Sequence, residues 1–324
     1  MTVRPFRFSV QAFDAASAAE WTGIARKAED LGYATLFATD HHFGPGDIAD
    51  RSGHRPVGVA PIAAMAAAAA ATSQLRVGCR VFCVDYHHPA VLAKELATLD
   101  MLSEGRLEIG MGAGWTAAEY EGLGIEMDTP GTRIERLAES LDVLDAHFSG
   151  RPIEVSGKHV RVHGFSGLPA PVQSPRPPLM VGGGSPKILR LAGARADIVS
   201  VNLDNRSGAL GAASVLGADA AATDAKLGWI REGAGDRFAG IELEVAAYFI
   251  AIGDGAAAAT DAMAARFGVD PAAFAGHPHA LLGSIDEVCD RLLERRERFG
   301  FSYVCVAQRH LDEFAPVVAR LSGA

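Results

Sequence analysis

The chain has 324 residues, of which 49% are hydrophobic, and its formal net charge is −9. This length suits one large α/β domain or two ordinary ones, with a core large enough to fold without disulfide bonds or structural metals. The 30 lysines and arginines are scattered rather than clustered, so we expect no nucleic-acid interface.

Strand-like and helix-like segments alternate through the first half of the chain. Residues 1–6 contain no apolar run of signal-peptide length, so no signal peptide is expected. Four strand–helix pairs then follow, identified by the spacing of their apolar residues. The predicted strands are 7–10, 34–38, 75–84 and 106–111, and the predicted helices are 15–31, 59–72, 89–102 and 132–148. The alanine-rich second helix is too short and too weakly hydrophobic to span a membrane.

The alternation breaks after residue 150 and then resumes. Residues 153–162, with Gly157-Lys158 at their centre, predict a hairpin, and a proline-rich stretch follows at 169–178. The later predicted strands are 179–181, 196–201, 241–252 and 301–306, and the helices are 186–194, 218–231, 256–267, 284–298 and 312–321. We therefore expect a single domain, residues 1–324, with insertions near 151–178 and 268–283.

Eight strands, each followed by a helix, predict an α/β protein with a closed (β/α)8 TIM barrel. An open doubly wound sheet is the alternative. No Gly-x-Gly-x-x-Gly run opens the first helix, which counts against a dinucleotide-binding half of that kind.

Several common catalytic motifs are missing from the sequence. It has no Gly-x-Ser-x-Gly elbow, no His-Glu-x-x-His pair and no phosphate-binding Gly-x-x-x-x-Gly-Lys-Ser loop. The four cysteines, Cys79, Cys83, Cys289 and Cys305, lack metal-ligand spacing, so no metal site is expected. Cysteine usage of this kind predicts a reduced, cytoplasmic protein.

The predicted strand ends carry the candidate functional residues, because barrels of this type place their chemistry there. The second strand ends in Asp40-His41-His42, and the fifth ends in Gly182-Gly183-Gly184-Ser185, directly before a helix. Glycine lets a flat ring approach the backbone closely, and free amides at a helix N-terminus suit a phosphate. The pattern therefore favours a large planar ligand over hydrolysis. A plain strand-to-helix turn with solvated histidines is the structural alternative.

The order of these motifs resembles the bacterial-luciferase-like superfamily, and more closely its branch that depends on coenzyme F420, a deazaflavin. The resemblance covers nearly the whole chain, and the order and spacing of the motifs make it specific. The matching runs are 36–42, 77–82, 88–89, 99–106, 110–115, 119–120, 132–139, 179–185, 196–197 and 314–319.

This resemblance implies a barrel with insertions, often dimeric, so we expect a homodimer that binds a small-molecule substrate. His41 matches the residue that faces the reacting edge of the ring, and Arg80-Val81 matches a bulged dipeptide behind the ring that is often a cis peptide. His41 is accordingly the predicted catalytic residue. The predicted cofactor-binding residues are Ser9, Asp40, His41, Arg80, Val81, Gly112, Gly182, Gly183, Gly184 and Ser185.

The sequence departs at one position from the sugar-phosphate dehydrogenases of this branch. In the family pattern that the resemblance implies for them, a glutamate that acts as an acid follows the glycines of the fourth strand. Trp115 occupies that place, and no set of basic residues for a sugar phosphate is evident. That activity is therefore not expected. Trp115 and His42 are predicted to contact the substrate, with Trp115 forming an apolar or aromatic wall.

The main functional interpretation is hydride transfer between F420 and an organic substrate with a C=C, C=N or C=O bond. His41 would give or take the proton, since an unperturbed imidazole has a pKa of about 6.5. An FMN-dependent monooxygenase is the first alternative, and a groove containing Lys158, Arg161 or Lys187 would favour F420 through its anionic tail. A barrel that binds a flavin-like ligand without turnover is the second alternative.

Substrate selection is expected to reside in the loops, because loops on a rigid scaffold carry specificity. Three such segments are long enough to matter: residues 44–57, the hairpin near Gly157, and residues 270–282.

Overall fold

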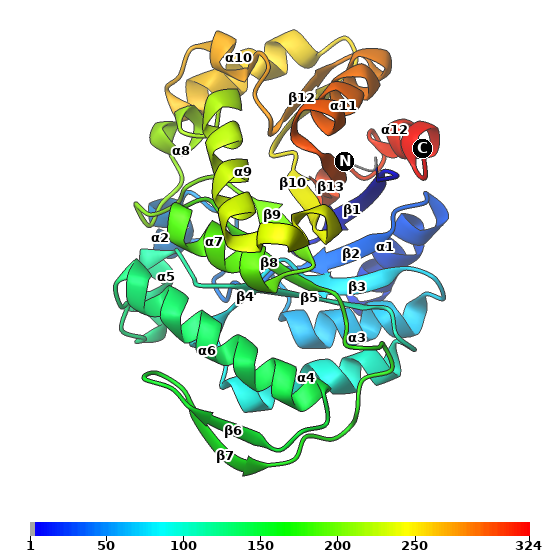
Figure 1. Ribbon diagram of the computed structural model, residues 1–324. Helices are drawn as coiled ribbons and strands as arrows, with labels where there is room; N and C mark the ends of the chain where they lie inside the picture. The colour runs from blue at the N-terminus through cyan, green and yellow to red at the C-terminus, as the bar shows by residue number, and fades with distance from the viewer. Residues whose placement is uncertain (1–3) are drawn as a thin grey trace.

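A computed structural model describes residues 4–324; residues 1–3, in the segment where no signal peptide is expected, lie outside the described residues. Parallel strands form one closed sheet in the order β3-β2-β1-β13-β10-β9-β8-β5, because β3 also pairs with β5 (Figure 1). The strands are β1 (Arg7–Gln11), β2 (Thr35–Ala38), β3 (Arg76–Cys79), β4 (Phe82–Cys83), β5 (Leu107–Gly112), β8 (Leu179–Gly183), β9 (Ile198–Val201), β10 (Glu242–Ala246) and β13 (Phe301–Ala307). The predicted (β/α)8 barrel is confirmed.

Helices cover the outside of the barrel, and their sequences explain how they do so. In α6 (Pro130–Phe148), Ile134, Leu137, Leu141 and Leu144 form the buried stripe that helical spacing predicts. Its first residue is proline, and Thr129 caps it by accepting a hydrogen bond from the Thr132 amide. The other covering helices are α1 (Ala18–Asp30), α3 (Pro61–Ala71), α4 (Pro89–Leu102), α7 (Pro186–Arg195), α9 (Ala220–Ala234), α11 (Ile285–Phe299) and α12 (Ala315–Leu321).

Two predicted strands are each divided in the structure. The strand predicted at 75–84 is interrupted between β3 and β4, where β4 continues along β5. The strand predicted at 241–252 was wrong as a single element, since β11 (Phe249–Ile252) leaves the barrel and pairs with β12 (Ala280–Gly283). Apart from Glu242 and Glu244 the run is apolar, because each half enters a core, so periodicity alone does not reveal where the chain changes its pairing partner.

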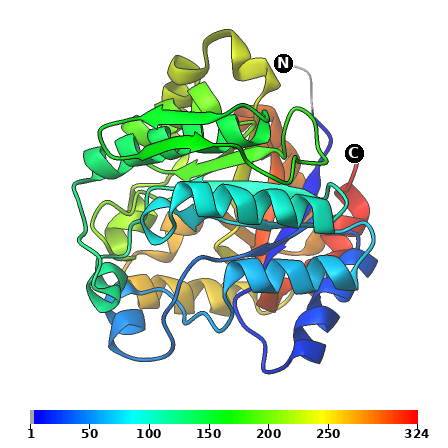
Figure 2. The same ribbon diagram turned by 90° about the horizontal axis from the view of Figure 1, so that it is seen from below.

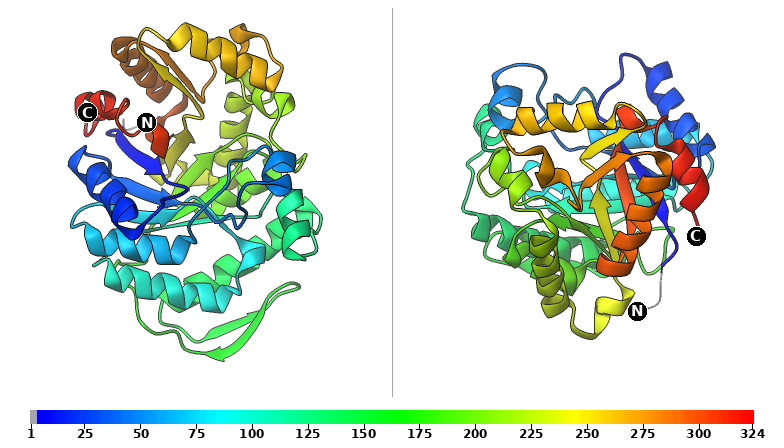
Figure 3. Two further views of the ribbon diagram at one scale, coloured as in Figure 1. Left: turned by 180° about the vertical axis from the view of Figure 1, so that it is seen from behind. Right: turned by 90° about the horizontal axis from the view of Figure 1, so that it is seen from above.

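The small sheet of β11 and β12 has its own apolar core. Phe249, Ala264 and Phe274 are buried together there, with α10 (Ala256–Phe267) and the 3-10 turn Pro271–Phe274 packed on it. This unit and α11 lie at the opposite end of the molecule from the hairpin of β6 (Ile153–Ser156) and β7 (Arg161–Phe165) (Figure 3).

The hairpin packs against the outside of the barrel. Ile153, Val160 and Val162 form a buried cluster with Ala90 of α4 and Val143 of α6. Figure 2 shows the hairpin lying over these helices. The hairpin therefore covers helices of the outer layer and does not reach the strand ends.

Three short helices that the sequence did not predict lie at one side of the barrel: α2 (Asp47–Ser52), α5 (Ala117–Leu123) and α8 (Ala212–Leu216) (Figure 1). Backbone hydrogen bonds connect their flanking residues: the Leu210 amide donates to the Ser52 carbonyl over 2.9 Å, and the Ala117 amide donates to the Gly208 carbonyl over 3.4 Å. They form one layer over the carboxyl ends of the strands.

A network of paired charges fills the amino end of the barrel. Glu108 of β5 is fully buried and receives hydrogen bonds from Arg7, from Arg76 Nε at 2.8 Å and from the Tyr303 hydroxyl at 3.0 Å. Arg7 Nε also donates to Glu242 Oε1 over 2.8 Å. Burial raises the pKa of the Glu108 carboxyl, but the two arginines outweigh it and hold that pKa below its usual value.

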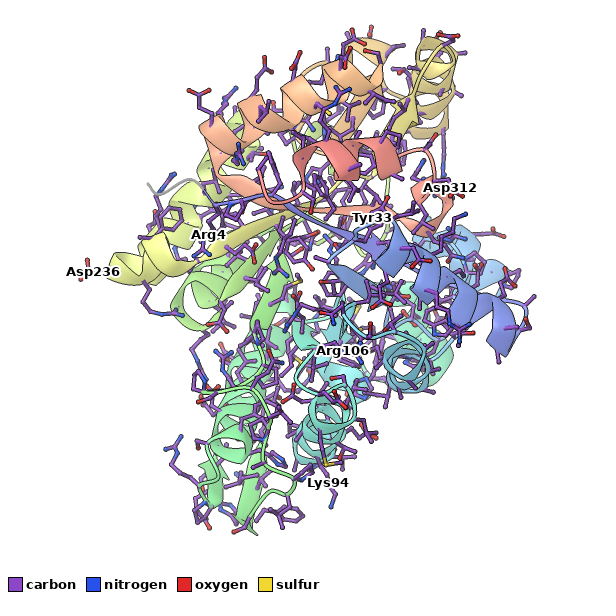
Figure 4. All side chains as sticks on the ribbon, turned by 90° about the vertical axis from the view of Figure 1, so that its right-hand side faces the viewer. Arg4, Tyr33, Lys94, Arg106, Asp236 and Asp312 are labelled. Atoms are coloured by element: carbon purple, nitrogen blue, oxygen red, sulfur yellow. The ribbon has the colours of Figure 1, made fainter. Side chains whose placement is uncertain are left out.

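The last part of the chain is fastened to the first. The Tyr33 hydroxyl, just before β2, donates to the Leu311 carbonyl over 2.9 Å, and Lys27 pairs with Asp312 nearby; Figure 4 shows Tyr33 and Asp312 on this side of the molecule. The Phe6 amide also donates to the Ala324 carbonyl over 3.1 Å. These bonds close the ring of elements between β13 and β1.

Candidate active site

A cavity of about 370 Å³ opens at the carboxyl ends of the barrel strands, and we call it the mouth cavity. It brings together most of the residues predicted from the sequence. Those that line it are Asp40, His41, Arg80, Val81, Gly112, Trp115, Gly182, Gly183, Gly184 and Ser185. Ser9 and His42 do not line it.

His41 is held by a carboxylate that the sequence analysis did not assign a role. Its Nδ1 lies 2.6 Å from Glu119 Oε2, and the other carboxylate oxygen accepts the backbone amide of His42 over 2.6 Å. Glu119 belongs to α5 and is fully buried. Because the carboxylate fixes the proton on Nδ1, Nε2 is the nitrogen that remains available in the cavity wall.

Asp40, the residue before His41, has a fully buried side chain. Its carboxylate accepts hydrogen bonds from the Cys83 amide at 2.8 Å, His87 Nε2 at 2.9 Å and His42 Nε2 at 3.2 Å. Burial opposes ionisation, but the bonds from His42, His87 and Cys83 prevail and lower the pKa of Asp40 to about 2. Asp40 therefore stays ionised and organises the loop around the second strand end.

His42 faces away from the mouth cavity, in contrast to its predicted contact with substrate. Successive side chains of an extended segment point in opposite directions, and the ring of His42 turns back onto Asp40. That hydrogen bond raises the pKa of His42 despite its partial burial. Ser9 is also outside the lining, because it is fully buried within β1 and its hydroxyl has no hydrogen-bond partner among the described residues.

The peptide bond between Arg80 and Val81 is cis, as the resemblance implied, and separates β3 from β4. Gln11 Nε2 donates to the Arg80 carbonyl over 2.9 Å. The Arg80 guanidinium is buried and donates to Glu244, to Ser200 Oγ at 3.0 Å and to Asn202 Oδ1 at 2.6 Å. Its charge is thus satisfied by the protein below the cavity floor.

Val81 forms part of the cavity floor, and neighbouring glycines leave room for it. A Cβ atom on Gly112 would collide with the Val81 side chain, so β5 needs glycine at that position. A Cβ on Gly184 would collide with the Leu203 carbonyl, so internal packing also requires part of the glycine loop. The amides of Gly184 and Ser185 nevertheless donate to no acceptor within residues 4–324, directly before α7 begins at Pro186.

Arg133 of α6 is a further donor without an acceptor, in addition to the free amides of Gly184 and Ser185. The residue is 4% exposed and lines the mouth cavity, yet its Nε and Nη1 atoms have no hydrogen-bond partner among the described residues. The start of α6 lies beside α7, since Lys187 Nζ donates to the Gly131 carbonyl over 3.2 Å. A buried guanidinium without an acceptor is costly, which points to a site that an anion completes.

Aromatic rings surround His41 on the other side. Its ring centroid lies 4.5 Å from that of His54, 5.6 Å from Phe43 and 5.9 Å from Trp115. His54 Nδ1 lies 2.7 Å from the Arg55 carbonyl, which fixes the proton on Nδ1. Burial, together with the charge of His41, lowers the pKa of His54 to about 3, so that its imidazole is neutral near pH 7.

Glu119, His54 and Arg133 were missed as site residues, although the first has a local signal. Thr116-x-x-Glu119 has the residue pattern of a capping box, which predicts a helix start at Thr116. The structure has α5 there but no capping box, because the Glu119 side chain turns to His41 and His42; the Thr116 hydroxyl has no hydrogen-bond partner among the described residues. Arg133 and His54 carry no such local signal.

The remaining sequence expectations concern a groove for the anionic tail of F420, metal ligands and membrane-spanning helices. Lys158, Arg161 and Lys187 do not line the mouth cavity; Lys158 and Lys187 both pair with Glu135 outside it. Within residues 4–324, no three histidine, cysteine or carboxylate side chains are grouped as metal ligands. The same part of the chain contains no helix that is both long and apolar enough to cross a membrane.

Comparison with curated proteins identifies relatives over part of the chain. An uncharacterised protein of Mycobacterium tuberculosis (strain ATCC 25618 / H37Rv) is 32% identical over 170 residues, which cover 49% of this chain and 58% of the relative. A protein of Mycobacterium bovis matches over the same extent. The chain thus spans a little more than half the length of these relatives.

Comparison with solved structures shows the same fold over nearly the whole chain. The coenzyme F420-dependent tetrahydromethanopterin reductase of Methanopyrus kandleri has a TM-score of 0.75 at 19% identity, covering 98% of this chain and 100% of its own. An F420-dependent secondary alcohol dehydrogenase has a TM-score of 0.76 at 16% identity, covering 98% and 99%. A long-chain alkane monooxygenase has a TM-score of 0.77 at 17% identity, covering 99% and 92%.

The solved structures at this identity establish the barrel, and a family model adds the sequence evidence. The model of the luciferase-like monooxygenases matches residues 2–288. That match contains the ends of all the barrel strands except β13, together with Glu119, Arg133 and the glycine loop. The chain therefore belongs to the luciferase-like monooxygenase family.

Proposed function

We propose that this protein is an oxidoreductase that transfers a hydride between coenzyme F420 and an organic substrate, with His41 handling the proton. The bound deazaflavin supplies or accepts the hydride. The observation that carries the proposal is the His41–Glu119 pair, whose free imidazole nitrogen belongs to the wall of a glycine-lined cavity.

The residues of the mouth cavity fit a phosphate-bearing tricyclic ring. Val81 and Gly112 form an apolar floor against which a flat ring can lie. The free amides of Gly184 and Ser185 and the unpartnered nitrogens of Arg133 provide donors for a phosphate, since helix N-termini and buried guanidinium groups both favour anions.

His41 has the geometry of a proton donor and acceptor. Glu119 accepts from Nδ1, so proton exchange takes place at Nε2, and the carboxylate stabilises the imidazolium when it forms. Trp115, Phe43 and His54 lie around the ring, and the His41 side chain is 16% exposed. The His41–Glu119 pair thus delivers a proton at Nε2 beside a wall of aromatic rings.

The charge of the cavity supports F420 over FMN. Six arginines and two aspartates line it, and four of the arginines remain when Arg80, paired with Glu244, and Arg206, paired with Asp204, are set aside. F420 carries an anionic tail beyond its phosphate, whereas FMN ends at the phosphate. An electropositive cavity attracts the more anionic cofactor more strongly, and salt weakens the attraction.

The test is a titration of the protein with F420 and, separately, with FMN, followed by fluorescence. We expect F420 to bind with the lower Kd, and Arg133→Gln to raise that Kd about 10-fold or more, in line with the loss of a charged hydrogen bond. Arg190→Gln is the matched control, because Arg190 is exposed on α7 and pairs with Glu232 outside the cavity.

Each outcome of the titration has a definite meaning. Tight binding of FMN alone, with oxygen consumed after reduction, would assign the monooxygenase reaction instead. Binding of F420 without oxidation or reduction of any substrate in a broad panel would support a ligand-binding barrel. Equal binding of F420 by the wild type and Arg133→Gln would remove Arg133 from the phosphate site.

A further inference from the structure

Three arginines lie together on the side of the mouth cavity formed by β1 and β13, and we call them the arginine rim: Arg55, Arg266 and Arg309. The Arg55 guanidinium lies over the Phe13 ring, 4.5 Å from its centroid. The Phe13 amide donates over 3.2 Å to Gln308, the residue before Arg309.

Arg266 completes the rim from a different part of the chain. It lies in the last turn of α10, with its guanidinium 5.5 Å from the centroid of the Phe267 ring, and both residues line the cavity. Phe267 in turn packs edge-on against Phe249, at a centroid distance of 5.6 Å.

Few carboxylates of the protein lie close enough to balance the positive charge of the arginine rim. Arg55 meets Asp14 at 3.4 Å, and Arg309 Nε donates to His310, whose other nitrogen contacts Glu313. Arg266 is exposed, and among the described residues it has no carboxylate partner within ion-pair distance. Desolvation lowers the pKa of Arg309, and the neighbouring charges of Arg55 and Arg266 lower it further. Like charges gathered in this way favour an anion among them.

The rim is separate from the site suggested for the cofactor phosphate. In the barrel, β1 and β8 are four strand positions apart, because β2, β3 and β5 lie between them in one direction. Arg133 and the glycine loop follow β5 and β8, whereas Arg55 lies against the residue after β1 and Arg309 follows β13. A phosphate at the first site cannot also occupy the second.

The rim is also close to the residue assigned to proton transfer. Arg55 directly follows His54, whose ring is 4.5 Å from that of His41, and the Trp115 ring lies 6.0 Å from His54. A molecule that fills the space between the aromatic rings and the rim would therefore present an apolar part to His41 and a charged part to the arginines.

We propose that the substrate is an anion, with an apolar or aromatic body beside His41 and a carboxylate held by Arg55, Arg266 and Arg309. This inference rests on the proposed function for the identity of the reacting ring, but the rim itself is defined by the protein alone. The sequence alone showed no evident set of basic residues for a sugar phosphate, whereas the rim combines basic residues from three distant segments.

The test compares two ligands of nearly equal shape that differ in charge, cinnamate and its uncharged amide, by calorimetric titration. The wild type should bind cinnamate at least 10-fold more tightly than cinnamamide, with an advantage that falls as salt rises. The double variant Arg266→Gln/Arg309→Gln should lose that advantage and keep its affinity for cinnamamide. Arg298→Gln, an exposed arginine paired with Asp224 on the outer surface, is the control.

Titrating both the cofactor-free protein and the protein with F420 separates the two proposals. Loss of cinnamate binding in the double variant without F420 supports the rim whatever the cofactor proves to be. If the double variant weakens F420 and leaves cinnamate unaffected, the rim holds the cofactor tail and the substrate proposal is wrong. Equal affinity of the wild type for cinnamate and cinnamamide, including no measurable binding of either, also overturns it.

Discussion

The two ends of the barrel are both rich in charge, but they use it differently. At the amino end, Arg7 and Arg76 converge on Glu108, and Glu242 balances Arg7. At the carboxyl end, Arg80 is paired in this way through Glu244. Arg133 Nε and Nη1, by contrast, have no hydrogen-bond partner among the described residues.

This contrast separates charges that hold the fold from charges that await a ligand. A buried pair satisfies both partners inside the protein, and removal of one leaves the other uncompensated. An unpaired guanidinium lowers stability until an anion arrives. Substitutions at the amino end should therefore act on the free energy of unfolding, and those at the mouth on binding or turnover.

The largest effect is expected at the mouth, from His41→Ala. Turnover should fall by about two to four orders of magnitude, because general acid–base catalysis contributes that much. The protein should remain folded, although its melting temperature falls because buried Glu119 loses its imidazole partner. Steady-state rates and thermal unfolding measured on one preparation check this. His163→Ala, on the exposed hairpin, is the control. Full activity of His41→Ala would remove the residue from the mechanism.

At the opposite end, Glu108→Ala should destabilise the fold by about 3–5 kcal/mol, because two arginines lose their shared buried partner. Urea unfolding followed by circular dichroism measures this change. The control Glu232→Ala, which removes the surface partner of Arg190, should cost about 1 kcal/mol or less. Similar losses in both variants would contradict the assignment of Glu108 to the fold.

An intermediate effect is expected from Glu119→Gln. The amide oxygen can still accept from His41 Nδ1, but the negative charge is lost, and a charged hydrogen bond is worth roughly 1 kcal/mol more than a neutral one. We expect kcat to fall roughly 10-fold with KM little changed. A rise in KM at constant kcat would instead show that Glu119 shapes the binding site.

A further effect concerns acid stability and His54. The folded protein holds the pKa of His54 near 3, below its unfolded value of about 6.5. Between these values the unfolded chain binds a proton that the folded chain does not, so the free energy of unfolding falls as pH decreases.

His54→Gln should therefore lose less stability than the wild type between pH 6.5 and 4.5. Urea midpoints at several pH values compare the two proteins, and this range lies above the pKa of Asp40, which is about 2. Parallel pH curves for both proteins would show that His54 is not held neutral by the fold.

Local patterns in the sequence were sufficient to predict the barrel and the residues on one side of the candidate site. Periodicity and glycine placement located the strands, and the end of β2 located Asp40 and His41. The same patterns did not reveal that 241–252 contains two strands, because both halves are buried. Alternation along an extended segment separates the directions of His41 and His42, but it did not show which of the two faces the cavity.

The other half of the site depends on contacts that no local pattern encodes. Glu119 lies 78 positions from His41 in the sequence, and Arg133 occupies a helix whose other residues show only an ordinary buried stripe. The arginine rim combines residues 55, 266 and 309, which look like scattered surface charges until the barrel closes. Tertiary structure alone brings such groups together.

The early departure of β11 from the barrel has a consequence for how such a protein can change. Arg266 and Phe267 belong to α10, which packs on the core of the small β11–β12 sheet, whereas His41 and the glycine loop belong to the barrel. If the arginine rim binds substrate as proposed, mutations in that peripheral module should alter which molecules are accepted without disturbing His41 or the glycine loop. The module is therefore the natural place to begin when the specificity of this scaffold is redesigned.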